Sequence, residues 1–160
     1  MYQFSYLKAQ SISEAVTALS SNPESKIIAG GMTLIPTMKQ RLASPEQLID
    51  IRHLEELKHI KIESNNILIG SISSHFEVST SDIVNEHMPS LAKLAEGIGD
   101  PHVRYMGTIG GAISNNDPTA DYPAACLGLG ATISTSKREV KAEDFFLNLF
   151  ETSLEEDEIV

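Results

Sequence analysis

The pattern of apolar and polar positions predicts short helices and short strands in mixed order. Behind the capping box of Ser11 and Glu14, apolar residues recur at helical spacing, which predicts a helix over 12–21. A second one-sided apolar pattern predicts a helix over 33–42. Short apolar runs predict strands over 26–28, 47–51 and 131–135, and the start of another strand over 158–160.

The middle of the chain combines a hairpin with a helical region. Apolar and polar residues alternate on both sides of Ser64-Asn65-Asn66, which predicts an antiparallel hairpin over 58–70. Residues 73–97 read as helix in pieces, and the residues around Asn116 and Asp117 read as the cap of a helix over 118–128. Because an antiparallel hairpin is mixed with helices, the pattern favours an α+β fold over a doubly wound parallel sheet.

Composition narrows the function classes. The 160 residues suffice for one domain or two small subdomains. With 12 Lys and Arg against 22 Asp and Glu, the net charge of −10 argues against nucleic-acid binding. The acidic last ten residues read as a solvated face. No apolar run predicts a membrane span and the first residues show no signal pattern, so we expect a cytoplasmic protein.

Cysteine and histidine usage also limits the chemistry. A single cysteine, Cys126, excludes an intrachain disulfide and cannot hold an ordinary iron–sulfur cluster. The five histidines lack metal-ligand spacing, so no metal site is predicted. Cys126 lies in an alanine-rich apolar run and is expected to be buried as a small hydrophobic residue.

Two glycine pairs are the main candidates for chemistry. Gly30-Gly31 leads from a predicted strand into a helix, and Gly110-Gly111 follows Thr108 in a second apolar run. Glycines let a ligand approach the backbone closely, and consecutive N–H groups bind anions, so the two pairs together suggest a clamp on a diphosphate. Either pair alone is better explained as a tight turn. The Rossmann and P-loop signatures are absent.

Residues near the second pair have two readings each. Asp117 and Asp121 are either helix caps or, for Asp121, an acceptor for ribose hydroxyls. His102 and Arg104 either offset phosphate charge or are simply solvated. Two further residues are expected to pack rather than stack on a flavin, namely Tyr105 and Tyr122.

Two long motifs give the chain a family resemblance. The stretch from Ile28 to Lys39 resembles the first FAD motif of the flavin (medium) subunit of molybdenum hydroxylases, as in aerobic carbon monoxide dehydrogenases and xanthine dehydrogenases. The stretch from Ile98 to Gly111 resembles the second FAD motif, and the stretches 117–124, 144–146 and 151–154 resemble later landmarks. The resemblance therefore covers nearly the whole chain, in order.

The resemblance implies a fold and a set of cofactor contacts. The fold is an α+β, PCMH-type (vanillyl-alcohol-oxidase-like) FAD-binding domain of two small α+β subdomains, over 1–55 and 56–160. The second subdomain is expected to be incomplete at its C-terminal end, and the family's C-terminal domain to be absent. The resemblance implies that residues 28–34 and 108–112 contact the pyrophosphate, that Ile98 lies near the flavin, and that Asp121 holds the adenosine. The expected cofactor-binding residues are Ile28, Ala29, Gly30, Gly31, Met32, Thr33, Leu34, Ile98, Thr108, Ile109, Gly110, Gly111, Ala112 and Asp121.

The resemblance also implies a flavin component of an oxidoreductase that is not active alone. Electrons would pass from [2Fe–2S] clusters on a small partner subunit through FAD to NAD, quinone or oxygen, while a large partner subunit carries molybdopterin. No residue of this chain is expected to be catalytic. Two residues depart from the family pattern: Ala112 replaces a frequent asparagine and Asn148 a frequent glycine.

Two alternatives remain open from the sequence. The first is a truncated, cofactor-free fragment that acts as an assembly or interaction module, with an exposed sheet edge near Ile159 and Val160. The second is another PCMH-type flavoenzyme with its own substrate.

Overall fold

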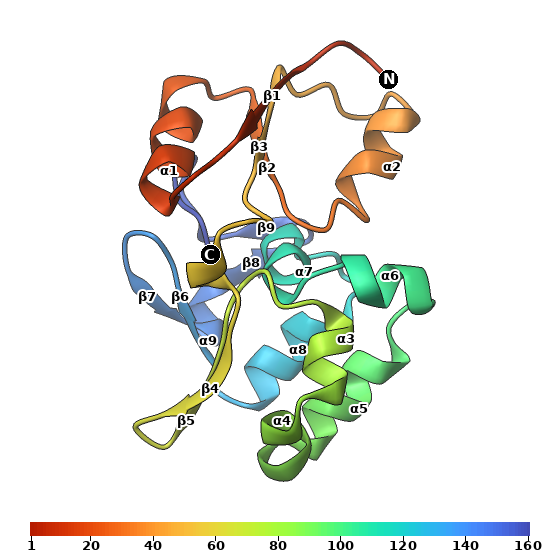
Figure 1. Ribbon diagram of the computed structural model, residues 1–160, viewed down its shortest axis with the longest axis vertical. Helices are drawn as coiled ribbons and strands as arrows, with labels where there is room; N and C mark the ends of the chain where they lie inside the picture. The colour runs from red at the N-terminus through yellow and green to blue at the C-terminus, as the bar shows by residue number, and fades with distance from the viewer.

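The N-terminal part of the molecule is a three-stranded parallel sheet with one helix on each side. The computed structural model describes residues 1–160. The strands lie in the order β1-β3-β2, so the central strand is the last of the three in sequence. Figure 1 shows α1 and α2 on opposite sides of this sheet. The elements are β1 (Ser5–Lys8), α1 (Ile12–Ser21), β2 (Ser25–Ile28), α2 (Leu34–Lys39) and β3 (Gln47–Asp50).

The alternation of side chains along β3 explains why both faces are covered. Ile49 belongs to the buried cluster that also contains Ala15 and Leu19 of α1. Leu48, one position earlier, belongs to a separate cluster with Met38 of α2. Because successive strand residues point to opposite faces, one short strand anchors both helices.

The remainder of the chain is a mixture of short helices and two-stranded hairpins below the sheet (Figure 1). The β4–β5 hairpin is antiparallel, as are the β6–β7 and β8–β9 pairs. The elements are η1 (Glu55–Leu57), β4 (Ile60–Glu63), β5 (Asn66–Ile69), α3 (His75–Thr80), α4 (Asp82–His87), α5 (Pro89–Gly97), α6 (Pro101–Met106), α7 (Ile109–Asn115), α8 (Asp121–Gly128), β6 (Thr132–Ser134), β7 (Glu139–Lys141), α9 (Ala142–Phe145), β8 (Phe146–Asn148) and β9 (Glu151–Thr152).

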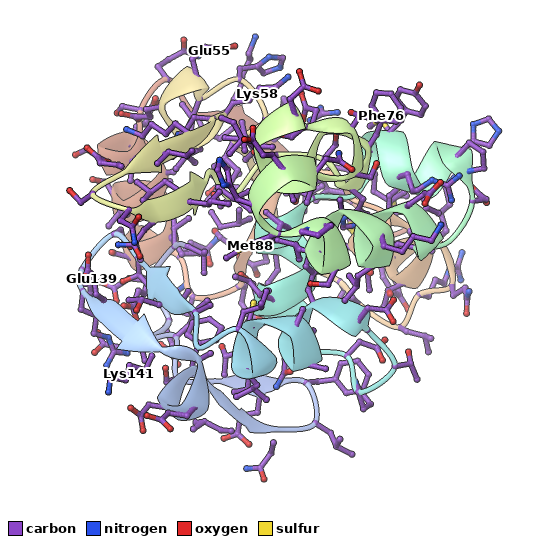
Figure 2. The ribbon with its side chains drawn as sticks, turned by 90° about the horizontal axis from the view of Figure 1, so that it is seen from below. Glu55, Lys58, Phe76, Met88, Glu139 and Lys141 are labelled. Atoms are coloured by element: carbon purple, nitrogen blue, oxygen red, sulfur yellow. The ribbon has the colours of Figure 1, made fainter.

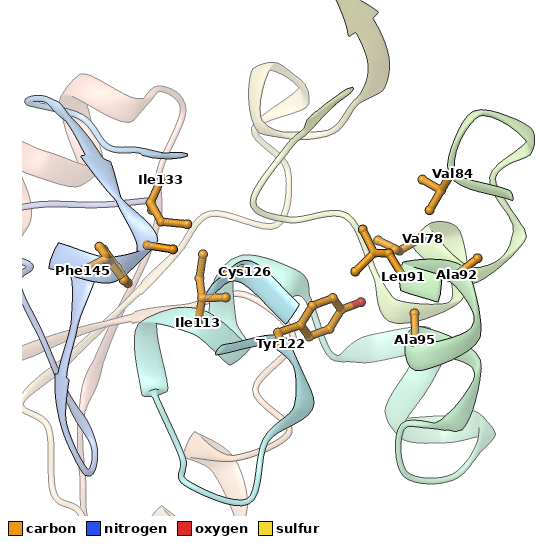
Figure 3. Close-up of a cluster of buried hydrophobic side chains, with 11 residues drawn as sticks. Val78, Val84, Leu91, Ala92, Ala95, Ile113, Tyr122, Cys126, Ile133 and Phe145 are labelled. Carbon is orange, nitrogen blue, oxygen red and sulfur yellow. The ribbon is translucent and has the colours of Figure 1, made fainter. Parts of the chain in front are cut away.

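The largest buried cluster lies in this second part of the chain. It contains 11 buried residues, drawn in Figure 3, from helices α3, α4, α5, α7, α8 and α9 and strand β6. Tyr122 and Phe145 are its largest fully buried side chains, with 1% and 0% exposure. Two residues from this second part of the chain, Ile72 and Ile159, instead join the N-terminal cluster around Ile49. The two parts of the chain therefore share apolar contacts.

Several predicted elements are confirmed. Helix α1 has the bounds predicted from its capping box, and Ser11 Oγ accepts a hydrogen bond from Glu14 N at 3.1 Å. The β4–β5 hairpin and the helical pieces over 73–97 are present, and β6 lies within the strand predicted over 131–135.

One strand was not predicted, and two predicted helices have different bounds. Strand β1 was not predicted, because its residues are mostly exposed and give no apolar run. The helix predicted over 118–128 begins only at Asp121, because Asp117 instead caps a turn by accepting hydrogen bonds from Thr119 N and Oγ1. The second helix ends at Lys39 rather than at 42.

The acidic end of the chain forms no strand, and it is solvated only in part: Glu151, Glu155 and Glu156 are exposed, whereas Glu158 is buried. Residues 158–160 form no strand, and Ile159 is only 6% exposed, with its carbonyl accepting a hydrogen bond from Ser136 N at 2.7 Å. The buried Glu158 carboxylate accepts hydrogen bonds from Arg138 Nε and Nη2, both at 3.0 Å. These bonds from Arg138 lower the pKa of Glu158 to about 2. Lys137 pairs with Glu155 and Asp157.

The helices of the structure are too short and too polar to include a membrane-crossing segment.

Candidate functional site

A cavity of about 920 Å³ separates the N-terminal sheet region from the helical region. Its volume falls within the range of roughly 300–1,000 Å³ that is typical of small-molecule and cofactor sites. Both glycine pairs contribute to its wall. The predicted cofactor-binding residues that line it are Ile28, Ala29, Gly30, Gly31, Met32, Thr33, Leu34, Ile98, Thr108, Gly110, Gly111, Ala112 and Asp121. Ile109 does not line it and instead packs against the large C-terminal cluster.

The first glycine pair lies in a loop rich in free backbone donors. β2 ends at Ile28 and α2 begins at Leu34, and Gly31 between them has φ +70°, in the left-handed region that favours glycine. None of the six backbone N–H groups from Ala29 to Leu34 donates a hydrogen bond to another group of the protein. The hydroxyl of Thr33 makes no capping bond either. A run of free N–H groups at a helix start is the arrangement that binds phosphate oxygens.

The other glycine of this pair brings the two parts of the chain into direct contact. A Cβ placed on Gly30 would lie 2.0 Å from the carbonyl oxygen of Met106 and 2.8 Å from the Cα of Gly107. No residue with a side chain fits there. The loop that carries the free N–H groups is thus fixed against the segment that leads into α7.

The second glycine pair differs from the prediction. It lies inside the first turn of α7, and the four N–H groups of residues 109–112 donate to Ser73 O, Ser71 O, Thr108 Oγ1 and Thr108 O. Only the first glycine pair therefore offers unpaired donors, and the expectation of the same anion-binding chemistry at both pairs is wrong. Gly110 serves close packing instead, because a Cβ there would lie 2.5 Å from Ser71 Cβ.

The charges around the cavity are mostly negative. Five carboxylates line it, from Asp117, Asp121, Glu155, Glu156 and Glu158, against a single cationic side chain, Lys26. Asp121 is exposed, and its carboxylate accepts no hydrogen bond within the protein, which leaves it free to accept bonds from ligand hydroxyls. A bound anion would therefore be held chiefly by backbone N–H groups.

Three polar side chains on the cavity wall have a buried atom without a hydrogen-bond partner. These atoms are Ser71 Oγ, His75 Nδ1 and the hydroxyl of Tyr122. Burial lowers the pKa of His75 to about 4 and raises the pKa of Tyr122, so both are neutral at pH 7. The rings of His75 and Tyr122 lie 5.3 Å apart between centroids. Sequence patterns did not select Ser71 or His75, since neither belongs to a recognisable motif.

The remaining candidates lie outside the cavity. His102 and Arg104 do not line it, so neither offsets phosphate charge there. Arg104 Nη1 donates to the carbonyl of Ile98 at 2.9 Å and so holds the loop that carries this predicted flavin contact. Tyr105 is 58% exposed and stacks on Phe76, labelled in Figure 2, with centroids 4.1 Å apart. Cys126 is buried as predicted, and burial raises the pKa of its thiol to about 11.

Comparison with known proteins gives a family match over nearly the whole chain. The family model described as "FAD binding domain in molybdopterin dehydrogenase" matches residues 2–160. The glyceraldehyde dehydrogenase medium chain of Sulfolobus acidocaldarius is 41% identical over 162 residues, which cover 99% of this chain and 58% of that protein. The carbon monoxide dehydrogenase medium chain of Hydrogenophaga pseudoflava is 39% identical, with 99% and 57% covered.

Solved structures show the same fold. A carbon monoxide dehydrogenase structure from Hydrogenophaga pseudoflava matches with a TM-score of 0.97 and 39% identity, covering 99% of this chain and 57% of that chain. Quinoline 2-oxidoreductase from Pseudomonas putida 86 matches with a TM-score of 0.96 and 33% identity, covering 99% and 57%. The chain thus spans little more than half the length of the relatives it matches. On these matches, the chain belongs to the family of FAD-binding domains of molybdopterin dehydrogenases.

Proposed function

We propose that the cavity binds FAD and that the chain acts as the flavin-carrying, electron-transfer component of a molybdenum hydroxylase. The observation that carries this proposal is the run of six unpaired N–H groups from Ala29 to Leu34 on the cavity wall. Such a run suits the two phosphates of FAD, and the nearly cation-free wall leaves these donors as the principal phosphate ligands.

The other predicted contacts take complementary roles in this proposal. The segment 108–112 would contact the diphosphate from the opposite wall through shape complementarity, since the N–H groups of residues 109–112 already donate hydrogen bonds within the protein. Asp121 would accept hydrogen bonds from the hydroxyls of the adenosine half, and Ile98 would lie against the flavin half. FAD supplies the redox chemistry when bound, and the residues of the chain position it and limit the access of water.

The proposal extends to partner chains and to domain organisation. The relatives are named as medium chains or FAD subunits of dehydrogenases and hydroxylases. By that similarity, electrons would arrive from the [2Fe–2S] clusters of a small subunit, after oxidation of a substrate on a large molybdopterin-binding subunit. They would leave to NAD, quinone or oxygen. The same proposal includes a division of the chain into two subdomains, residues 1–55 and 56–160, and a cytoplasmic location.

A comparison of three flavins tests whether the loop recognises the diphosphate. Titration of the purified chain with FAD, FMN and riboflavin is expected to give affinities in that order, because riboflavin lacks phosphate and FMN has only one. Equal affinities for the three flavins would contradict recognition through the Ala29–Leu34 loop.

Metal analysis tests the electron-transfer role. The chain isolated with its native partners is expected to carry molybdenum and the visible absorption of [2Fe–2S] clusters in addition to flavin. A native preparation with flavin but without molybdenum and iron would contradict the subunit role and favour an independent flavoenzyme.

The alternative of a cofactor-free interaction module has little support. It predicted an exposed sheet edge at Ile159 and Val160, but these residues form no strand and Ile159 is buried.

A further inference from the structure

The turn between β8 and β9 holds a large aromatic side chain in an unfavourable backbone conformation. Phe150 has φ +57°, in the left-handed region where glycine is preferred. Its side chain is also 61% exposed, so it contributes little to the core. The backbone of this turn therefore favours glycine, and the fold gains little from the phenylalanine ring.

A buried asparagine fixes this turn in place. Asn116, 8% exposed at the C-terminal end of α7, donates from Nδ2 to the carbonyls of Asn148 and Glu151, both at 2.8 Å. The N–H of Phe150 in turn donates to the carbonyl of Asn116 at 3.0 Å. Three hydrogen bonds thus define the position of Phe150, as expected where surrounding structure maintains a strained residue for its function.

The fixed position places Phe150 at the cavity. Phe150 lines the cavity wall, together with Asn115, Asp117 and Asp121 of the adjoining segment. Leu149, its neighbour in the same turn, is 72% exposed and does not line the cavity. Ile98, the proposed flavin contact, is carried by the separate loop that Arg104 holds.

We propose that Phe150 is a stacking residue for the adenine ring of the bound dinucleotide, and that Asn116 positions it. This inference rests on the proposed function, because it assumes a ligand with adenosine at the Asp121 end of the cavity. A phenyl ring offers a flat apolar face without hydrogen-bonding groups, which suits the face of a purine. Asp121 would then bind the ribose hydroxyls of adenosine, and Phe150 would stack on its base.

The test compares three ligands and two neighbouring residues. Isothermal titration with FAD, ADP and FMN is carried out on the unchanged chain and on Phe150→Gly, Phe150→Ala and Phe150→Tyr, with Leu149→Ala as the matched control. We expect Phe150→Gly and Phe150→Ala to weaken FAD and ADP binding by about tenfold, within the range found when an aromatic platform under a base is removed. FMN, which lacks adenine, is expected to bind as before, and Phe150→Tyr and Leu149→Ala to retain all affinities.

Urea unfolding separates a binding role from a structural one. Phe150→Gly relieves the backbone conformation, so its unfolding midpoint is expected to equal or exceed that of the unchanged chain. Unchanged affinities for ADP and FAD in both Phe150→Gly and Phe150→Ala would overturn the inference. Equal losses of affinity for FMN and FAD, together with a lower urea unfolding midpoint, would also overturn it. Absence of FAD binding to the unchanged chain would instead overturn the proposed function, while the response of ADP binding to Phe150 variants still decides the adenine contact.

Discussion

Gly30 is the position where one added methyl group should damage both the fold and the site. In Gly30→Ala, the new Cβ would lie 2.0 Å from the carbonyl oxygen of Met106 and 2.8 Å from the Cα of Gly107. Favourable non-bonded contacts between carbon atoms lie at roughly 3.5–4.0 Å. Because the opposing atoms belong to the backbone, no side-chain rotation relieves the clash, and the two segments must separate.

The size of the effect follows from this geometry. Overpacking of a well-packed region costs typically about 1–3 kcal/mol, and contact with two backbone atoms places Gly30→Ala near the upper value. A loss of about 3 kcal/mol in the free energy of unfolding lowers the melting temperature of a chain of this length by roughly 6–12 °C. The same displacement moves the loop of free N–H groups, so the affinity for FAD should fall as well.

The assay is urea unfolding combined with FAD titration, and the matched control is Gly128→Ala. A Cβ at Gly128 meets no atom within 4 Å, and Gly128 lies in helix α8. This control should raise stability by about 0.5–1 kcal/mol, because alanine favours helix. If Gly30→Ala matches the control in both stability and FAD affinity, the contact between the Gly30 loop and the segment before α7 is refuted.

Three further predictions concern charge, positioning and burial. Hydrogen bonds from Arg138 lower the pKa of Glu158 to about 2, so the ionised carboxylate stabilises the fold above about pH 4.5, the pKa of this group in the unfolded chain. The urea concentration at the unfolding midpoint should therefore fall as the pH is lowered from 4.5 toward 2, and it should fall less in Glu158→Gln. Arg104→Met frees the carbonyl of Ile98 and should weaken FAD binding several-fold in titrations, whereas an unchanged affinity would exclude a positioning role. The buried Cys126, whose pKa burial raises to about 11, should react with a thiol reagent at least tenfold more slowly in the native chain than in urea, and equal rates would contradict its burial.

The sequence alone predicts the helices and the hairpin whose ends are marked by capping or turn residues. The Ser11 cap defines the start of α1, and Pro89 occupies the first turn of α5. The turn residues Ser64 and Asn65 both adopt positive φ in the β4–β5 hairpin. Each of these elements depends on contacts between residues close in sequence, so one stretch of chain contains the necessary information.

The features that were missed depend on distant partners. β1 is a strand because it pairs with β3, about 40 residues later, and its own residues are mostly exposed. The pairing of the α7 N–H groups depends on Ser71 and Ser73, which no motif includes. The acidic end becomes ordered because Arg138 lies opposite Glu158. Nearly all of the cofactor-binding residues predicted from motif similarity line one cavity, but the motifs do not show which backbone N–H groups remain free.

Titration of the purified chain with FAD is the most direct test of cofactor binding by the cavity. We expect one FAD molecule to bind per chain at saturation and the complex to remain yellow through gel filtration. ADP should compete for the same site, since it shares the diphosphate and adenosine. A colourless chain that takes up no FAD at any concentration tested would contradict the assignment of the cavity to this cofactor.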